Sequence, residues 1–221
     1  MKKIISYSLW GNENKYLIGA IKNAELCKKI YPDWICRFYT DESVKNYIVD
    51  ELINLNSEII IKKYSHEFEP YLWRFLAISD KDVEIMLSRD CDSRLNLREK
   101  IAVDEWLNSD KNFHIIRDHP HHNYLIMAGM WGVKNNILCN MNELINNWIN
   151  INIKQNDQLF LANIIYPRIC NDVFIHDEFV RFESNKHKIK QNRINYEYIG
   201  EYYDENDICS QYHKDELKKY I

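Results

Sequence analysis

Two carboxylates one residue apart follow a short apolar stretch in the middle of the chain. Residues 83–88 form the apolar stretch, Asp90 and Asp92 follow it, and Arg89 and Arg94 flank the pair. Because residues two apart in an extended chain point to the same side, both carboxylates can face one pocket. Carboxylates held that close repel each other unless protonation or a cation relieves the repulsion. One or two carboxylates together with substrate phosphates are the usual ligands of Mg²⁺, so the pair predicts a divalent-cation site.

The same two aspartates allow other interpretations. They could be solvated side chains of a surface turn, because short motifs of this kind also occur by chance. They could also belong to a phosphohydrolase, with Asp90 as the nucleophile and Asp92 as the acid. Two observations disfavour the phosphohydrolase: three predicted strands precede the motif, and Arg94 stands where a Thr or Val is usual.

The elements that must position the pair alternate between strands and helices. The apolar pattern of the first half predicts strands at residues 3–8, 34–39, 58–61 and 83–88, and helices at 15–30, 44–55 and 71–78. The second half predicts helices at 96–107, 141–149 and 157–165, strands at 113–116 and 173–176, and then a loop or tail. This alternation predicts one α/β domain with a mostly parallel sheet flanked by helices, which binds ligands at the carboxyl ends of its strands.

Several residues near the predicted strand ends are candidates to line such a site. Ser6, Tyr7, Leu9 and Trp10 close the first strand and could hold a flat base, although Trp10 could equally be a packing aromatic. Gly129 lies in a stretch with two of the five glycines of the chain, and a glycine lets a backbone approach a ligand closely.

Two further polar motifs have less specific interpretations. The three histidines within residues 117–122 are of a type that binds metals, but the proline in that loop favours a structural or substrate-loop role. Asp157 follows Asn156, a good helix N-cap, so it could simply complement the helix dipole.

Composition limits the class of protein. The chain has 221 residues, of which 46% are hydrophobic and 28% charged, and a net charge of −4 that gives no reason to expect a nucleic-acid partner. Its six cysteines form no Cys-x-x-Cys pair, which favours free thiols in a reducing compartment. The apolar run after Met1 is too short for a signal peptide or a membrane span. We therefore expect a cytoplasmic protein, of a bacterium or of a host cell if the source is viral.

With these residues in place, the chain resembles glycosyltransferases of the GT-A fold, in particular the glycogenin and lipopolysaccharide galactosyltransferase group and small members from bacteria and large viruses. The resemblance covers most of the chain. Its parts come in the expected order: the first strand, residues 71–75, Asp90-Cys91-Asp92, Ala128-Gly129-Met130, Asn156-Asp157-Gln158 and His176. The resemblance implies a hexosyltransferase that uses a nucleotide-sugar donor, with a UDP-sugar favoured, and a glycan or other hydroxyl acceptor. The Asn-Asp-Gln segment favours retention of configuration.

The resemblance further implies a divalent cation, Mn²⁺ first and Mg²⁺ second. Asp90 and Asp92 would bridge this cation to the donor, and His176 would complete its shell. One departure is that the segment after His176 lacks the Gly and Lys of the His-x-x-Gly-x-x-Lys pattern usual in that group. The leaving diphosphate then needs another cation, for which three arginines are candidates: Arg89, Arg117 and Arg181.

The donor is expected to contact residues from both halves of the chain. Arg74 would position the donor or orient an aspartate, and Asp157 with Gln158 would line the reacting sugar. Residues 1–95 would form the nucleotide-binding part and residues 96–221 the acceptor side of the single domain. The remaining expected donor contacts are Ser6, Tyr7, Leu9, Trp10, Arg89, Cys91 and Gly129. A nucleotide-sugar-binding module without turnover is the alternative outside the enzymes.

Overall fold

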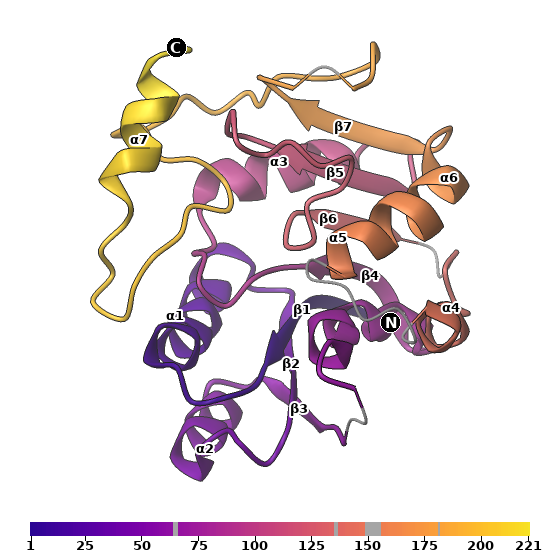
Figure 1. Ribbon diagram of the computed structural model, residues 1–221, viewed down its shortest axis with the longest axis vertical. Helices are drawn as coiled ribbons and strands as arrows, with labels where there is room; N and C mark the ends of the chain where they lie inside the picture. The colour runs from indigo at the N-terminus through magenta and orange to yellow at the C-terminus, as the bar shows by residue number, and fades with distance from the viewer. Residues whose placement is uncertain (64–65, 135–136, 149–155, 181) are drawn as a thin grey trace.

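A mostly parallel sheet forms the centre of the molecule (Figure 1). The computed structural model describes residues 1–63, 66–134, 137–148, 156–180 and 182–221, and among these the sheet has seven strands in the order β3-β2-β1-β4-β6-β5-β7. The first four strands are all parallel: β1 (Lys2–Leu9) lies between β2 (Ile35–Thr40) and β4 (Val83–Ser88), and β3 (Glu58–Ile61) pairs with β2.

The other half of the sheet contains its antiparallel strand. β6 (Trp131–Lys134) runs antiparallel to both of its neighbours, β4 and β5 (Phe113–Arg117), and β7 (Val173–Asp177) pairs with β5 in parallel. The carboxyl end of β4 is therefore next to that of β1 on one side and to the start of β6 on the other. Residues after β4 thus lie where parts of the chain from both halves meet.

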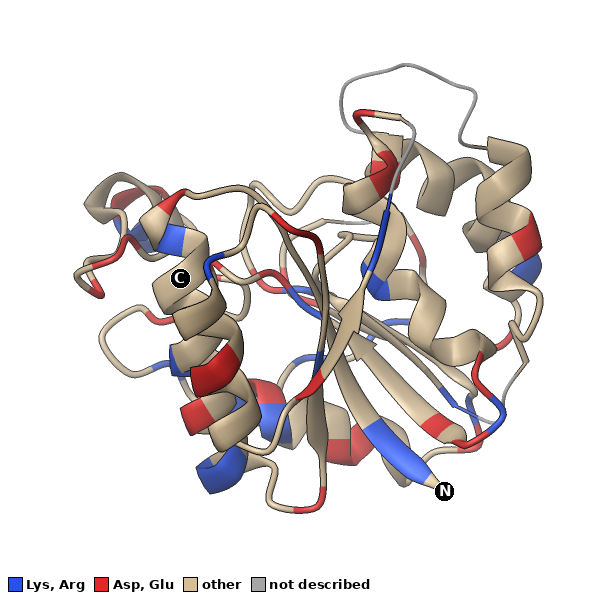
Figure 2. Ribbon diagram, turned by 90° about the horizontal axis from the view of Figure 1, so that it is seen from below, with Lys and Arg blue, Asp and Glu red and all other residues tan. Residues whose placement is uncertain are grey.

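Helices cover both faces of the sheet (Figure 2). One layer consists of α1 (Asn14–Ile30), α2 (Asn46–Asn54) and α3 (Leu97–Leu107). Their buried side chains form one apolar cluster with those of β1, β2 and β4. The opposite layer consists of the 3₁₀ helix η1 (Glu69–Ser79), α4 (Met141–Trp148), α5 (Asn156–Phe160) and the π-helical turn η2 (Leu161–Ile165), which continues into α6 (Tyr166–Ile169). Near the end of the described chain, α7 (Gln211–Lys218) lies beside the first layer. None of the described helices is both long and apolar enough to cross a membrane.

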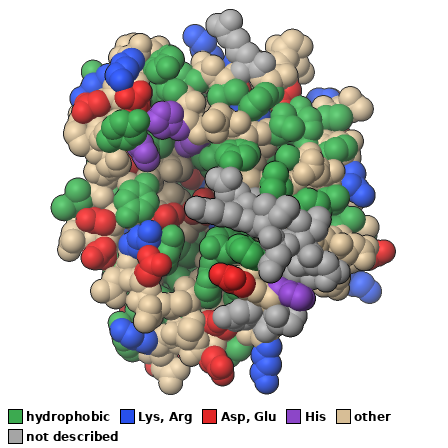
Figure 3. Space-filling model, viewed as in Figure 1, with side chains coloured by type: hydrophobic (Ala, Val, Ile, Leu, Met, Phe, Trp, Pro, Cys, Tyr) green, Lys and Arg blue, Asp and Glu red, His purple; other side chains and the backbone are tan. Residues whose placement is uncertain are grey.

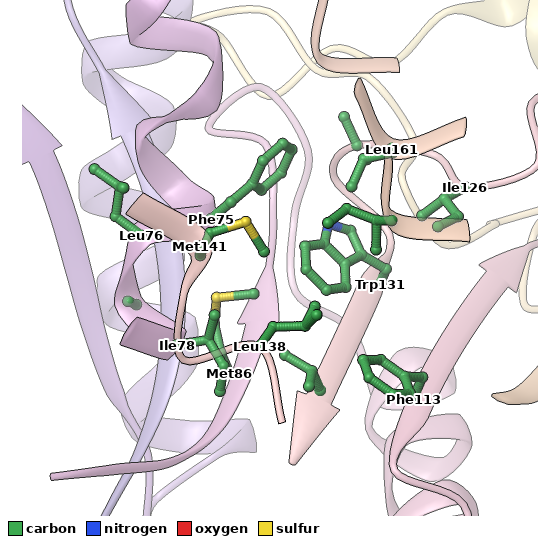
Figure 4. Close-up of a cluster of buried hydrophobic side chains, with 14 of the residues drawn as sticks. Phe75, Leu76, Ile78, Met86, Phe113, Ile126, Trp131, Leu138, Met141 and Leu161 are labelled. Carbon is green, nitrogen blue, oxygen red and sulfur yellow. The ribbon is translucent and has the colours of Figure 1, made fainter. Parts of the chain in front are cut away.

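The larger of the apolar clusters lies under η1 and α4 (Figure 4). Phe75 of η1 meets Trp131 of β6 edge to face, with ring centroids 5.5 Å apart, and stacks on Phe160 at 6.0 Å. Such aromatic pairs contribute about 1 kcal/mol each beyond the area they bury. This packing fixes η1 against the sheet, and η1 carries Arg74.

The single α/β domain with a mostly parallel, helix-flanked sheet is confirmed, and the predicted elements differ from it in three places. β6 was not predicted, because only Trp131 and Val133 of its four residues carry large apolar side chains. The predicted tail contains α7, whose one buried side chain, Leu217, gives no periodic signal. The helix predicted at 157–165 starts as α5 and then widens into η2. The end of the predicted helix at 141–149 lies outside the described residues.

Candidate active site

Asp90 and Asp92 lie in the turn that follows β4, with Cys91 between them. The thiol of Cys91 is buried and donates to the backbone oxygen of Ser8 at 3.5 Å, on the inner side of the turn. The Asp90 carboxylate is 42% exposed. The two aspartates interact electrostatically with each other. The turn therefore buries the middle residue and leaves its two acidic neighbours to share one environment.

A glycine lets the backbone after residue 128 approach Asp90. A Cβ atom at Gly129 would lie 1.9 Å from Oδ2 of Asp90, which no real side chain allows. The neighbouring Ala128 accepts a hydrogen bond from the hydroxyl of Ser88 at 2.7 Å. Gly129 thus forms one wall around Asp90, and its lack of a side chain is what permits that approach.

Arg74 joins two parts of the chain that are far apart in sequence. Its Nη1 forms an ion pair with Oδ1 of Asp90, and its Nη2 lies 2.8 Å from Oδ2 of Asp157. The backbone N–H of Arg74 donates to the hydroxyl of Ser8 at 3.0 Å, which ties η1 to the end of β1. The Nε–H of Arg74 is buried and has no hydrogen-bond partner among the described residues.

Asp157 and Gln158 start α5 beside this arginine. The Oδ1 of Asp157 accepts from the backbone N–H of Gln158 at 2.9 Å, as expected for an acidic residue at a helix start. The Oε1 of Gln158 accepts from the backbone N–H of Ala128 at 3.2 Å, which links α5 to the backbone segment that contains Gly129. Burial raises the pKa of Asp157, while the charge of Arg74 lowers it and that of Asp90 adds to the rise.

The acidic pair is short of positive charge. Burial, followed by repulsion from Asp90, raises the pKa of Asp92 to about 6, and the ammonium of Lys15 opposes this rise. Arg74 forms ion pairs with Asp90 and Asp157, whereas its charge acts on Asp92 only from a distance. Oxygen ligands that hold excess negative charge are what a hard divalent cation prefers. The residues present thus fit a cation held by two carboxylates, with its remaining ligands supplied by a bound phosphate and water.

His176 does not lie with these aspartates. Its ring is fully buried between β5, β7 and α3, where its Nδ1 lies 2.8 Å from Nε2 of His114 and its Nε2 lies 3.5 Å from Glu105. Among the described residues, no group of three His, Cys, Asp or Glu side chains is arranged to hold a metal. The expectation that His176 completes a metal shell therefore needs correction. The residue ends a strand, as the sequence predicts, but its side chain points into the packed layer below α3.

Arg89 and Cys91 also point away from the acidic pair. Arg89 is 2% exposed and pairs with Glu99 of α3 at 2.8 Å, and its Nη1 donates to the backbone oxygens of Ser88 and Trp131. Because side chains alternate along an extended segment, the orientation that exposes Asp90 sends Arg89 into the core. Neither side chain is in a position to contact a donor, which corrects two expected donor contacts.

The end of β1 contributes backbone and one hydroxyl instead of the expected side chains. Ser6, Tyr7 and Leu9 are buried, and Tyr7 stacks on Phe38 of β2 with ring centroids 4.8 Å apart. Trp10 is partly buried and meets Tyr71 of η1 edge to face at 4.8 Å. Of these four side chains, that of Trp10 alone is partly accessible to solvent.

Ser8 is the residue of this strand end that sequence reasoning missed. It receives the N–H of Arg74 on its hydroxyl and the thiol of Cys91 on its backbone oxygen. Its place next to the last residue of β1, Leu9, is the one signal in the sequence that could have indicated it.

The remaining polar motifs of the second half are structural. Asp118 is fully buried and accepts hydrogen bonds from Arg98, Arg193 and the backbone N–H of Ile199. Arg117 is equally buried and pairs with Asp177 at 2.9 Å and with Glu183, so it is not free to bind a diphosphate. Arg181 lies outside the described residues.

The histidine loop packs against the chain near α7. The Nε2 of His119 lies 2.9 Å from the backbone oxygen of His213, and the ring of His119 packs on Tyr198 with centroids 4.5 Å apart. The Nδ1 of His122 accepts from the backbone N–H of Asp118 at 3.1 Å. These contacts agree with the structural role that the proline favoured. In Figure 3 histidine side chains (purple) gather beside a hollow near the centre of the face shown.

Comparison with solved structures identifies the fold. Over 80% of this chain and 82% of the other, the structure matches that of a glycosyltransferase involved in the glycosylation of the major capsid of PBCV-1, with 18% identity and a TM-score of 0.54. It also matches 4-diphosphocytidyl-2C-methyl-D-erythritol synthase from Anaerococcus prevotii over 86% and 93% of the two chains, with 11% identity and a TM-score of 0.50. No protein-family model matches the sequence, and no curated protein does either. The chain has the GT-A fold.

Proposed function

We propose that this protein is a metal-dependent glycosyltransferase that moves a sugar from a nucleotide-sugar donor to a hydroxyl of a glycan or similar acceptor. The observation that carries this proposal is the arrangement of Arg74 between Asp90 and Asp157. It joins the turn after β4, where a cation and a diphosphate would bind, to the start of α5, where a reacting sugar would lie. The fold, which it shares with a solved glycosyltransferase, supports the same proposal.

In this proposal, Asp90 and Asp92 hold the cation, with Mn²⁺ favoured over Mg²⁺. When bound, the cation neutralises charge that develops on the leaving diphosphate. The raised pKa of Asp92 supports the assignment, because a carboxylate that resists ionisation next to another carboxylate gains from a nearby cation. A UDP-sugar is the favoured donor.

The protein groups that would meet the diphosphate are Arg74 and Lys15. The positive charge of Arg74 acts on both Asp90 and Asp92, and that of Lys15 acts on Asp92. Of the three arginines expected from the sequence, Arg89 and Arg117 pair with Glu99 and Asp177 instead, and Arg181 stays a candidate outside the described residues. Residues 1–95 then supply the nucleotide side, and residues 96–221 the acceptor side.

Asp157 and Gln158 would face the transferred sugar. Gln158 is held by the backbone of Ala128, and Asp157 by Arg74, so both side chains are oriented before a ligand binds. An oriented carboxylate at that point can hold a sugar hydroxyl or stabilise positive charge at the anomeric carbon. Retention of configuration is the favoured outcome.

The test measures nucleoside diphosphate released from a panel of nucleotide sugars, with added Mn²⁺ or with chelator, and with glycan acceptors. We expect release that needs the cation and increases with the right acceptor. Asp92→Asn should abolish it, and the matched control Asp33→Asn, at an exposed aspartate in the turn between α1 and β2, should not.

Other outcomes of the same experiment identify the alternatives. Binding of a nucleotide sugar without turnover would indicate a binding module, and hydrolysis of simple phosphomonoesters would indicate the phosphohydrolase. Diphosphate release from a nucleoside triphosphate and a sugar phosphate would indicate nucleotidyl transfer, since the GT-A fold also occurs in a diphosphocytidyl synthase.

A further inference from the structure

Helix α1 contacts the turn that carries Asp90 and Asp92. Gly19 and Asn23 lie one helical turn apart, on the same side of α1. A Cβ atom at Gly19 would lie 2.0 Å from the backbone oxygen of Cys91, so the helix backbone touches the turn directly. Asn23 is 1% exposed, and its side chain contacts residues 91–95 of the turn.

The side chain of Asn23 forms its hydrogen bonds with the backbone of this one turn. Its Nδ2 donates to the backbone oxygens of Ser93 at 2.8 Å and of Cys91 at 3.4 Å. Its Oδ1 accepts from the backbone N–H of Leu95 at 3.0 Å. Both N–H donors of the amide and one acceptor site are thus used on residues 91–95.

A buried asparagine in the interior of a helix needs a reason. Asparagine is a weak helix former, and burial of an amide is costly unless it is hydrogen-bonded. Here the amide pairs the backbone N–H of Leu95 and adds hydrogen bonds to the backbone oxygens of Cys91 and Ser93, which also accept from Arg94 within the turn. The hydrogen bonds that offset the burial of the Asn23 amide are therefore all made with the turn between Asp90 and Leu95.

We propose that Asn23 is a positioning residue of the metal turn, and that Gly19 provides the close contact it needs. Together they fix the backbone of Cys91, and this determines where the carboxylates on either side of it, those of Asp90 and Asp92, can meet a cation. The inference rests on the proposed function, because it assigns to α1 the geometry of that same site. Neither residue touches the cation or the donor.

Other contacts also hold the turn. The N–H and hydroxyl of Ser93 bond the backbone oxygen of Asp90, and the N–H of Tyr203 donates to the backbone oxygen of Asp92 at 2.8 Å. The side chain of Arg94 donates to the backbone oxygens of Cys91 at 3.3 Å and Ser93 at 3.0 Å, but Arg94 belongs to the turn itself. Asn23 is the side chain of α1 that fixes the turn to the helix layer.

The experiment measures Mn²⁺ affinity with UDP present, by calorimetry at a temperature where every variant is folded. Asn23→Ala removes all three hydrogen bonds, and we expect its Mn²⁺ affinity to fall at least about tenfold. The matched control is Cys27→Ala, which truncates a buried side chain of α1 one turn further on, away from residues 90–95. It should lower the melting temperature while the Mn²⁺ affinity stays within about twofold of the parent.

Gly19→Ala provides a second variant that leaves no polar group unpaired. In an unobstructed helix interior, alanine stabilises relative to glycine. Here its Cβ must push the oxygen of Cys91, so we expect weaker Mn²⁺ binding with the helix intact. This variant keeps the inference testable if Asn23→Ala does not fold.

The outcomes separate the inference from the function on which it rests. If the parent binds Mn²⁺ with UDP but Asn23→Ala and Gly19→Ala bind it equally well, the positioning role is refuted and the proposed function stands. If Cys27→Ala weakens Mn²⁺ binding as much as they do, the effect belongs to stability and the role is again refuted. If the parent itself binds no Mn²⁺, the proposed metal site fails and the inference fails with it.

Discussion

The guanidinium of Arg74 lies 2.8 Å from Asp157, although 83 positions separate the two residues along the chain. η1 brings the arginine and α5 brings the carboxylate, and both are mostly buried. The contact draws the start of α5 to the turn of the acidic pair.

Nucleotide binding should depend on a divalent cation. Asp90 and Asp92 repel phosphate unless a cation lies between, so UDP should stabilise the protein only when Mn²⁺ or Mg²⁺ is present. At a UDP concentration of about 100 times its dissociation constant, the free energy of unfolding should rise by about 2.7 kcal/mol. Thermal shift with and without chelator measures this. Equal shifts under both conditions would remove the cation from the nucleotide site.

Acidification should weaken cation binding and stabilise the cation-free protein. The pKa of Asp92 is raised to about 6, above its usual value, so the folded state binds a proton more readily than the unfolded chain. By linkage, this stabilising protonation is present at low pH and is lost as the pH rises through about 6. A proton on Asp92 also competes with the cation, so Mn²⁺ affinity should fall from pH 7 to pH 5.

Asp92→Asn is the control for this pH dependence. The variant lacks the titrating group, so its unfolding free energy should lose the decrease that the parent shows between about pH 4 and pH 6. Its melting temperature at pH 7 should equal or exceed that of the parent, because the repulsion from Asp90 is gone. Loss of folding in Asp92→Asn would show that the residue is needed for structure instead.

Removal of Arg74 should affect both stability and donor use. Arg74→Ala leaves Asp157 buried without its cation, which should cost about 3 kcal/mol of unfolding free energy. Turnover with the donor should fall at least about tenfold, or about 1.4 kcal/mol of transition-state stabilisation. Denaturant titration and steady-state kinetics measure the two effects.

Arg74→Lys is the matched variant. It keeps the charge, but a single ammonium cannot bridge two carboxylates as the planar guanidinium does. We expect it to recover part of the stability and little of the turnover. If Arg74→Ala leaves donor kinetics unchanged, Arg74 has no part in the site.

Asp157→Asn should separate catalysis from packing. The amide oxygen can still accept from one of its two present donors, Arg74 or the N–H of Gln158, so the free energy of unfolding should fall by only about 1–2 kcal/mol. Turnover should fall by about a hundredfold or more, as for loss of an acid or base group, while cation-dependent UDP binding persists. Sugar transfer near the parent rate would leave Asp157 as a helix-start residue that pairs with Arg74. Asp118 could not then replace it, because two arginines already enclose that carboxylate.

The sequence by itself determined the order of the elements and the place of the acidic pair. Apolar periodicity is local, so it predicted β1 to β4, α1 and α3 from the residues that form them. The alternation of side chains in an extended segment likewise predicted that Asp90 and Asp92 can face one side, whereas the burial of Cys91 was not predicted. These features depend on neighbours within a few residues along the chain.

The tertiary structure decided which polar side chains reach the site. Arg89, Arg117 and His176 have suitable chemistry, but each finds a buried partner on another element: Glu99, Asp177 and His114 respectively. Ser8 and Asn23, which have no motif of their own, contact the site through packing. A buried charge or amide must be paired, and its partner comes from wherever the fold brings one. Such pairings join residues far apart in sequence, so only the folded chain shows them.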